Sequence, residues 1–206
     1  EVIPNGLDDT SCPPASESLV AHWRGLLGEG FCLFIGVLRY YKGLESLVLA
    51  AAHVNAPIVI AGDGPELDRL RALAKAGAVT NVIFLGHVSE EDKAALLRLA
   101  CVFVFPSHLR SEAFGMSLIE AAMHSKPMIS CEIGSGTSYI NQHNVTGLVV
   151  PPEAPQALAS AMQRFLNDPE FARAMGSAAR DRYEKLFTGQ QMAASYDSVY
   201  RRILSQ

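Results

Sequence analysis

Short apolar runs recur between residues 31 and 150, and a more polar, amphipathic stretch follows most of them. Runs of this length without polar alternation are typical of strands buried on both faces, whereas the amphipathic stretches are typical of helices that cover a sheet. The predicted strands are Phe31–Val37, Ile58–Ala61, Val82–Leu85, Cys101–Phe105, Pro127–Cys131 and Gly147–Val150.

Helical patterns lie between most of these runs, at Leu44–His53, Pro65–Ala76, Glu90–Ala100 and Met116–Ser125. Ser89 and Asp92 have the spacing of a capping box at the start of the third helix. Regular alternation of strands and helices indicates βαβ units and a parallel sheet. We therefore predict an α/β fold, a doubly wound Rossmann-like domain whose six-stranded, mainly parallel sheet carries helices on both faces.

The two ends of the chain depart from this alternation. Residues 8–30 mix turn-forming residues with one apolar-periodic piece, so we expect a loop and a modest helix near Leu19–Leu27. Two prolines at 151–152 end the last strand, and three consecutive helices are predicted at Pro155–Leu166, Glu170–Leu186 and Gln191–Leu204. Residues 1–206 are thus expected to form one domain with a helical C-terminal segment.

Composition excludes several classes of function. The net charge of −4 leaves no basic stripe for nucleic acid. The four cysteines lack C-x-x-C spacing, which favours reduced core residues over a zinc site, and no acidic cluster indicates another metal. No apolar run approaches the roughly eighteen residues that a membrane-spanning helix requires.

Glycines and charged residues gather where the predicted strands end. In an open parallel sheet, ligands bind in the crevice beyond the carboxyl ends of the strands. The loops that carry these residues are Gly36–Gly43, Gly62–Pro65, Gly86–Val88, Glu112–Glu120 and Gly134–Tyr139. We expect these five loops to form one binding site.

Two of these loops carry candidate ligand-binding groups. Glu112 follows the fourth strand and Glu120 lies one turn into the next helix, so both carboxylates can face one crevice. The helix N-terminus near Gly115 favours anions, and together these groups suggest a sugar phosphate as ligand. Arg39 and Lys42 add two cations, although solvated surface positions are the common alternative for all of these charged residues.

The motifs resemble those of a known family. Glu112-x-Phe114-Gly115-x4-Glu120 resembles the E-x-F-G-x4-E signature of the retaining glycosyltransferases of family four, which have two Rossmann domains in the GT-B arrangement. The stretch from Gly36 to Gly43 resembles that family's G-R-L-x-x-x-K-G diphosphate loop, with Val37 in place of the arginine. Ala61-Gly-Asp-Gly-Pro65 resembles its A-G-x-G-P turn, and the resemblance covers most of the chain.

The resemblance implies a role for each candidate residue. The chain would be the donor-binding half of an enzyme that transfers a sugar from a nucleoside diphosphate sugar to an acceptor hydroxyl, without a cofactor or metal. Lys42 and Arg39 would stabilise the departing diphosphate, and Glu112 would hold sugar hydroxyls near the anomeric carbon. The donor-binding positions would be Gly36, Gly62, Val88, Phe114, Gly115, Met116, Ser117, Leu118 and Glu120, with Glu120 on the ribose hydroxyls and the base near Val88.

The resemblance also bears on partners and location. Val2-Ile-Pro-Asn-Gly6 is similar to the stretch that follows the link from the acceptor domain to the donor domain. We therefore expect an excised fragment that lacks the N-terminal acceptor domain, transfers no sugar alone, and uses residues 190–206 to return toward that domain. The loops look most like those of bacterial surface-polysaccharide enzymes, which favours GDP-mannose over a UDP-sugar. The implied location is the cytoplasm, with the inner face of the plasma membrane as an alternative for the full-length enzyme.

Two other classes of function stay open at this stage. A non-catalytic nucleotide-binding module would use the same loops without chemistry. An NAD-dependent Rossmann domain would share the fold, but neither Gly62-x-Gly64 nor Gly134-x-Gly136 completes the G-x-G-x-x-G fingerprint. The loop at 134–141 either binds an anion or caps a short helical turn.

Overall fold

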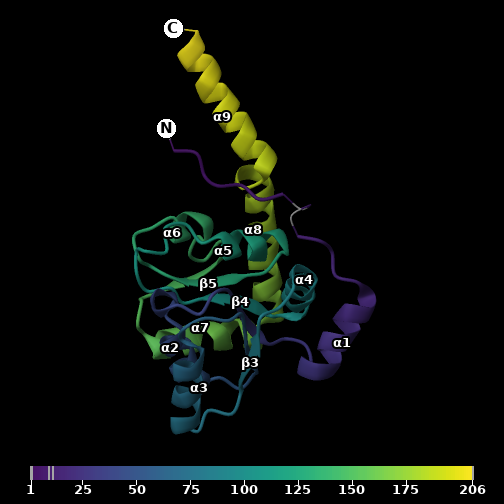
Figure 1. Ribbon diagram of the computed structural model, residues 1–206, viewed down its shortest axis with the longest axis vertical. Helices are drawn as coiled ribbons and strands as arrows, with labels where there is room; N and C mark the ends of the chain where they lie inside the picture. Colours follow the sequence, from purple (N-terminus) through teal and green to yellow (C-terminus); the bar gives the residue numbers. More distant parts are fainter. Residues whose placement is uncertain (1, 9, 11, 206) are drawn as a thin grey trace.

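The computed structural model describes residues 2–8, 10 and 12–205 (Figure 1). Its strands are Cys32–Ile35 (β1), Ile58–Ala61 (β2), Val82–Gly86 (β3), Val102–Phe105 (β4), Met128–Cys131 (β5) and Gly147–Val150 (β6). They form one sheet in the order β3-β2-β1-β4-β5-β6, and every paired strand is parallel. The predicted six-stranded parallel α/β fold is confirmed. Glu1 and Gln206, the ends of the predicted 1–206 domain, lie outside the described residues.

The helices also follow the sequence pattern. They are Glu17–Leu27 (α1), Leu44–Ala51 (α2), Leu67–Ala76 (α3), Glu90–Leu99 (α4), Met116–Met123 (α5), Pro155–Asn167 (α7), Pro169–Leu186 (α8) and Gly189–Leu204 (α9). The capping box of Ser89 and Asp92 is present. Two short elements fall inside predicted loops, the 3-10 turn Tyr40–Lys42 (η2) and the one-turn helix Thr137–Ile140 (α6).

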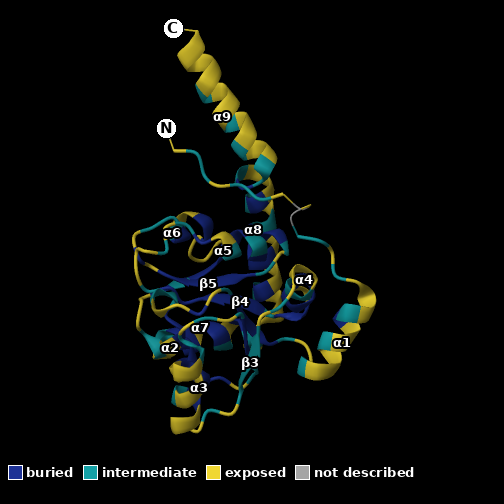
Figure 2. Cartoon of the chain, viewed as in Figure 1, coloured by how far each residue is buried: buried dark blue, intermediate teal, exposed yellow. Residues whose placement is uncertain are grey.

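Each face of the sheet carries its own hydrophobic core, which is why the strands are apolar throughout. Along β1, Cys32 and Phe34 face the core formed with α2, α3 and α7, whereas Leu33 and Ile35 face the core formed with α4 and α5. Side chains of a strand alternate between faces. The strands are accordingly buried along their length, except for β3, which is half-buried throughout, and Val149 of β6, which is half-buried (Figure 2).

The order in which strands are added to the sheet reverses at β1. β2 and β3 lie on one side of β1 and β4 to β6 on the other, so the loops that leave the carboxyl ends of β1 and β4 diverge. A crevice at such a switch point is the usual ligand site of a doubly wound sheet. The first of these two loops carries Lys42 and the second carries Glu112.

The final helix extends away from the sheet, and the start of the described chain lies near it (Figure 1). Leu7 joins the two ends, since its amide donates to the Phe187 carbonyl at 2.8 Å and its carbonyl accepts from the Tyr183 hydroxyl at 2.8 Å. Helix α9 exposes Tyr196, Tyr200 and Ile203. Among the described residues, no helix is long and apolar enough to cross a membrane.

Candidate functional site

A cleft of about 480 Å³ opens where β1, β4 and the start of α5 meet. It brings together eight of the twelve predicted site residues, which are Gly36, Lys42, Glu112, Phe114, Gly115, Met116, Ser117 and Glu120. It also contains Lys93 of α4, which the sequence analysis did not select. The other four predicted residues, Arg39, Gly62, Val88 and Leu118, are not among the residues that line it.

Lys42 and Glu112 link the two diverging loops by a short ion pair between Nζ and Oε2. Their side chains are only 13 and 12 % exposed, and the buried Ser107 hydroxyl donates to the same Glu112 oxygen at 3.4 Å. Lys42 Nζ also lies 4.9 Å from the Phe105 ring centroid. An ammonium group has three donors, so pairing with Glu112 leaves Lys42 able to bind a further anionic oxygen.

Gly62 supports the Gly36 loop from below. A Cβ at Gly62 would lie 2.0 Å from the Gly36 carbonyl oxygen, and its φ of +134° belongs to a region that other residues avoid. The Leu38 amide donates to the Asp63 carbonyl at 2.9 Å. The glycine-rich turn after β2 therefore shapes the loop that presents Lys42. Contact between Gly62 and a bound donor stays a prediction.

Arg39 lies at the surface beside the cleft. Val37 and Arg39 are both exposed and Leu38 between them is fully buried. The Arg39 amide donates to the Val37 carbonyl at 3.0 Å, so the chain turns tightly at Leu38 instead of continuing as extended strand. Within the described chain, the Arg39 guanidinium makes no hydrogen bond or ion pair. A contact between Arg39 and a bound diphosphate stays a prediction.

The start of α5 offers backbone donors to the cleft. Gly115 adopts a left-handed conformation with φ of +95° at the helix N-cap. In the part of the chain that the structure describes, the amides of Met116 and Ser117 have no acceptor, whereas the Leu118 amide donates to the Gly115 carbonyl at 2.9 Å. Leu118 is also fully buried, so this turn offers donors from Met116 and Ser117, and Leu118 packs beneath them.

Val88 is half-buried and packs against the core between the sheet, α4 and α5. The adjoining Gly86 carbonyl accepts from the Gly62 amide at 2.7 Å, which fixes the loop after β3 beside the loop after β2. Contact between Val88 and a base stays a prediction.

Glu120 faces Lys93 across the cleft. Lys93 Nζ lies 3.4 Å from Glu120 Oε1 and 2.5 Å from Glu90 Oε2. Burial raises the pKa of the Glu120 carboxyl above its ordinary value, and Lys93 offsets only part of this effect. One sequence signal pointed to Lys93, because it lies in the first turn of a helix that begins at the same edge of the sheet.

The loop after β5 supports the motif loop rather than presenting donors to the cleft. The Glu132 carboxylate accepts from the Gly134 amide at 2.9 Å and from the Ser138 hydroxyl at 2.8 Å. The Gly136 amide donates to the Ala113 carbonyl at 2.9 Å, and a Cβ at Gly136 would lie 2.5 Å from the Phe114 ring. Of the two alternatives for 134–141, the contacts favour a cap for α6.

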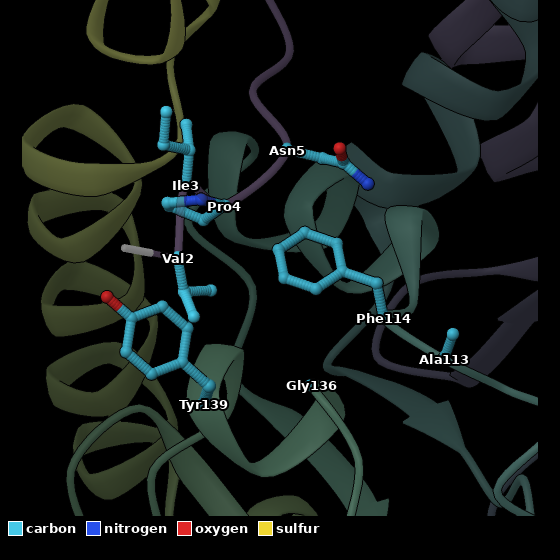
Figure 3. A pocket seen from close by; sticks show the side chains of 8 residues that line it. All are labelled: Val2, Ile3, Pro4, Asn5, Ala113, Phe114, Gly136 and Tyr139. Carbon is cyan, nitrogen blue, oxygen red and sulfur yellow. The ribbon is translucent and has the colours of Figure 1, made fainter. Parts of the chain in front are cut away.

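A second pocket of about 550 Å³ adjoins the cleft and shares Ala113 and Phe114 with it. Val2, Ile3 and Pro4 line it together with Tyr139, whose ring lies next to Val2, and the Phe114 ring lies across from them (Figure 3). The Phe114 ring also makes an edge contact with Phe187, with centroids 6.3 Å apart. Phe114 therefore separates the two pockets.

Residues 24–182 match the family model described as "Glycosyl transferases group 1". The chain belongs to this family. The resemblance found from the sequence motifs is thereby confirmed at the level of the glycosyltransferase family. This glycosyltransferase chain is 54 % identical over 187 residues to the D-rhamnosyltransferase WbpZ of Pseudomonas aeruginosa, which covers 91 % of the chain and 49 % of the relative.

A second relative, the O-antigen chain mannosyltransferase C of Escherichia coli, is 45 % identical over 203 residues, covering 98 % of this chain and 54 % of the relative. This group 1 glycosyltransferase chain thus spans about half the length of the curated relatives it matches.

Solved structures of GT-B glycosyltransferases share the fold. The sucrose-phosphate synthase of Thermosynechococcus elongatus superposes with a TM-score of 0.87 at 29 % identity, over 100 % of this chain and 53 % of that one. Anabaena HepE in complex with UDP gives a TM-score of 0.85 at 22 % identity, over 100 % of this chain and 57 % of that one. The HepE likeness concerns the fold alone.

Proposed function

We propose that this chain binds the nucleoside diphosphate sugar of a retaining glycosyltransferase, and that the full-length protein transfers the sugar to an acceptor hydroxyl. One observation carries the proposal. The Lys42–Glu112 pair, the open amides of Met116 and Ser117, and the Glu120 carboxylate line a single cleft at the switch point of the sheet. These groups match a ligand that has both a diphosphate and several hydroxyls.

Each group has a distinct task in the proposed reaction. Negative charge develops on the departing diphosphate, so the Lys42 ammonium and the α5 amides stabilise the transition state by donors already in place. Glu112 accepts hydrogen bonds from sugar hydroxyls near the anomeric carbon. Glu120, farther along α5, accepts from the ribose hydroxyls and fixes the nucleotide.

For the donor, GDP-mannose is favoured over a UDP-sugar. The relatives at 54 and 45 % identity are named as a D-rhamnosyltransferase and an O-antigen chain mannosyltransferase, and the second name supports a mannosyl donor. The HepE structures contain UDP, but at 22 % identity they bear on the fold only. The relative named as an O-antigen chain mannosyltransferase also favours a role in cell-surface polysaccharide synthesis and a cytoplasmic site of action, with the inner face of the membrane as the alternative.

The remainder of the site belongs to a second domain in this proposal. Val2, Ile3 and Pro4 line a pocket next to the cleft, and the exposed face of α9 lies at the same end of the molecule (Figure 1). A domain that covers this end would bring the acceptor to the donor. The return of residues 190–206 toward that domain is part of the same proposal.

A panel of nucleotides tests the proposed function. GDP, UDP or dTDP should raise the melting temperature of the 206-residue chain, while NAD should not. Glu120→Gln should weaken the binding of the tightest-binding nucleotide by about 1 to 3 kcal/mol. The chain alone should transfer no sugar. Stabilisation by NAD alone would favour the dehydrogenase class, whereas turnover by this chain would contradict the need for a second domain.

Arg39→Ala tests whether Arg39 takes over the diphosphate contact of the family's arginine, whose position Val37 occupies in this chain. We expect roughly fivefold weaker binding of a nucleoside diphosphate, unchanged binding of the nucleoside, and a change in stability below about 0.5 kcal/mol because Arg39 is exposed. Calorimetric titrations with GDP and guanosine measure the difference. Val37→Ala, at the neighbouring exposed position, is the matched control. Equal losses for both ligands would assign Arg39 to the base or to loop shape.

A further inference from the structure

Lys93 occupies a position between two helices that the proposed reaction does not yet explain. Its ammonium lies between Glu90 Oε2 at 2.5 Å, on its own helix α4, and Glu120 Oε1 at 3.4 Å, on α5. The Lys93 and Glu120 side chains are 17 and 19 % exposed, whereas Glu90 is 56 % exposed. A lysine whose only partner was Glu90 would be expected to lie in solvent with it, but the Lys93 side chain is largely buried.

The charges around Glu120 act in opposite directions on its ionisation. Burial raises the pKa of the Glu120 carboxyl, Lys93 lowers it, and Glu90 raises it further. Burial acts to lower the pKa of Lys93, but its hydrogen bonds and charge interactions with Glu90 and Glu120 outweigh burial and raise that pKa. Lys93 is therefore charged at neutral pH.

Other charged groups near Glu120 have partners of their own. Lys42 and Glu112 pair with each other in the same cleft. His124, one turn along α5, contacts the backbone carbonyl of Glu120 through Nδ1 at 2.9 Å. Lys93 is the cation that contacts the Glu120 carboxylate among the described residues.

We propose that Lys93 is a positioning residue for the donor nucleotide, which holds the Glu120 carboxylate in the orientation that accepts the ribose hydroxyls. This inference rests on the proposed function. A carboxylate has two oxygens with about four acceptor sites. Lys93 contacts Oε1, which fixes the plane of the group and leaves acceptor sites for two adjacent hydroxyls. Fixing that geometry before binding removes an entropic cost that the ligand would otherwise meet.

The first experiment compares Lys93→Met with Lys93→Arg in calorimetric titrations of the 206-residue chain with GDP and UDP. Lys93→Met should weaken the binding of the tighter-binding nucleotide roughly tenfold at neutral pH, which is the size expected for the loss of a hydrogen bond to a charged group. Lys93→Arg should retain most of the affinity of the unaltered chain. Binding requires the ionised carboxylate, so affinity falls as the pH drops through the Glu120 pKa. Without Lys93 this fall should begin at a higher pH.

The second experiment separates positioning from a general structural role. With the 2′,3′-dideoxy form of the same nucleotide, Lys93→Met should bind as tightly as the unaltered chain, because the hydroxyls that Glu120 would accept are absent. In a Glu120→Gln background, Lys93→Met should cause no further loss. Equal losses for the ribo and dideoxy nucleotides, or an unchanged pH profile, would overturn the inference.

Glu90→Gln provides a matched control on the other side of Lys93. It removes the competing carboxylate, so nucleotide affinity should stay the same or rise, and the fall at low pH should shift to a lower pH. A loss as large as that of Lys93→Met would mean that the Glu90–Lys93 pair acts only on the structure of α4. If Glu120→Gln alone changes nothing, the ribose contact of the proposed function fails. If Glu120→Gln weakens binding but Lys93→Met does not, only the present inference fails.

Discussion

Lys42→Met is expected to weaken the binding of a nucleoside diphosphate roughly a hundredfold, while leaving the binding of the corresponding nucleoside nearly unchanged. Lys42 is the cation held between the two loops at the switch point, and its loss removes a donor to the diphosphate. The same change leaves the Glu112 carboxylate without its partner, and that negative charge then repels the ligand. Titrations of GDP and guanosine into the two proteins measure the effect.

A double variant separates the charge of Lys42 from its pairing. Lys42→Met alone should lower the free energy of unfolding by about 1 to 3 kcal/mol, because a carboxylate that is only 12 % exposed loses its ion pair. Adding Glu112→Gln should recover much of that stability in urea denaturation and the part of the diphosphate affinity lost to repulsion, but not the part lost with the Lys42 donor. Full recovery of affinity in the double variant would show that Lys42 acts only by neutralising Glu112.

The strands and helices were predictable because strands buried on both faces of a parallel sheet appear in the sequence as short continuous apolar runs, and the helices between them appear as amphipathic stretches. The main difference is the first strand, predicted as Phe31–Val37 and observed as Cys32–Ile35. Gly36 and the turn at Gly62 end the ladder, yet Leu38 is still fully buried beneath the next loop. Apolar character therefore predicted burial correctly except at Val37, which is exposed, and overestimated the length of the strand.

The gathering of most candidate residues in one cleft was also predictable, since parallel strands bring all of their carboxyl ends to one edge. The contacts within that edge were not. Gly62 and Leu118 belong to sequence motifs, but one supports a loop and the other packs in the core. A motif records which residues are needed and does not distinguish those that touch a ligand from those that shape the surface.

Lys93, in contrast, lines the cleft but belongs to none of the motifs that the sequence analysis used. It lies in the first turn of α4, where the capping box and the acidic residues look like ordinary helix-start signals. Its contact with Glu120 joins positions 27 residues apart on different helices. Only the fold, which places α4 and α5 on the same face of the sheet, brings the two side chains together, and a single sequence gives no pairwise signal for that contact.

Gly62→Ala is expected to lower the free energy of unfolding by about 3 kcal/mol or more, and to weaken diphosphate binding as well. Two effects add at this position. The backbone φ of +134° is strained for any residue with a side chain, and the new Cβ would collide with the Gly36 carbonyl oxygen at 2.0 Å. The Gly36 loop would have to move, and it carries Lys42 into the cleft. Urea denaturation and GDP titration measure the two consequences.

Gly86→Ala is the matched control, because Gly86 is the bridge partner of Gly62 and also has a positive φ, of +73°. Nothing lies within 4 Å of a Cβ built there, so this substitution introduces backbone strain without a collision. We expect it to lower stability by only about 1 to 2 kcal/mol and to leave GDP affinity unchanged. If the two alanine variants lose equal stability and both retain full affinity, backbone strain alone explains the glycine at 62, and the turn after β2 does not shape the Lys42 loop.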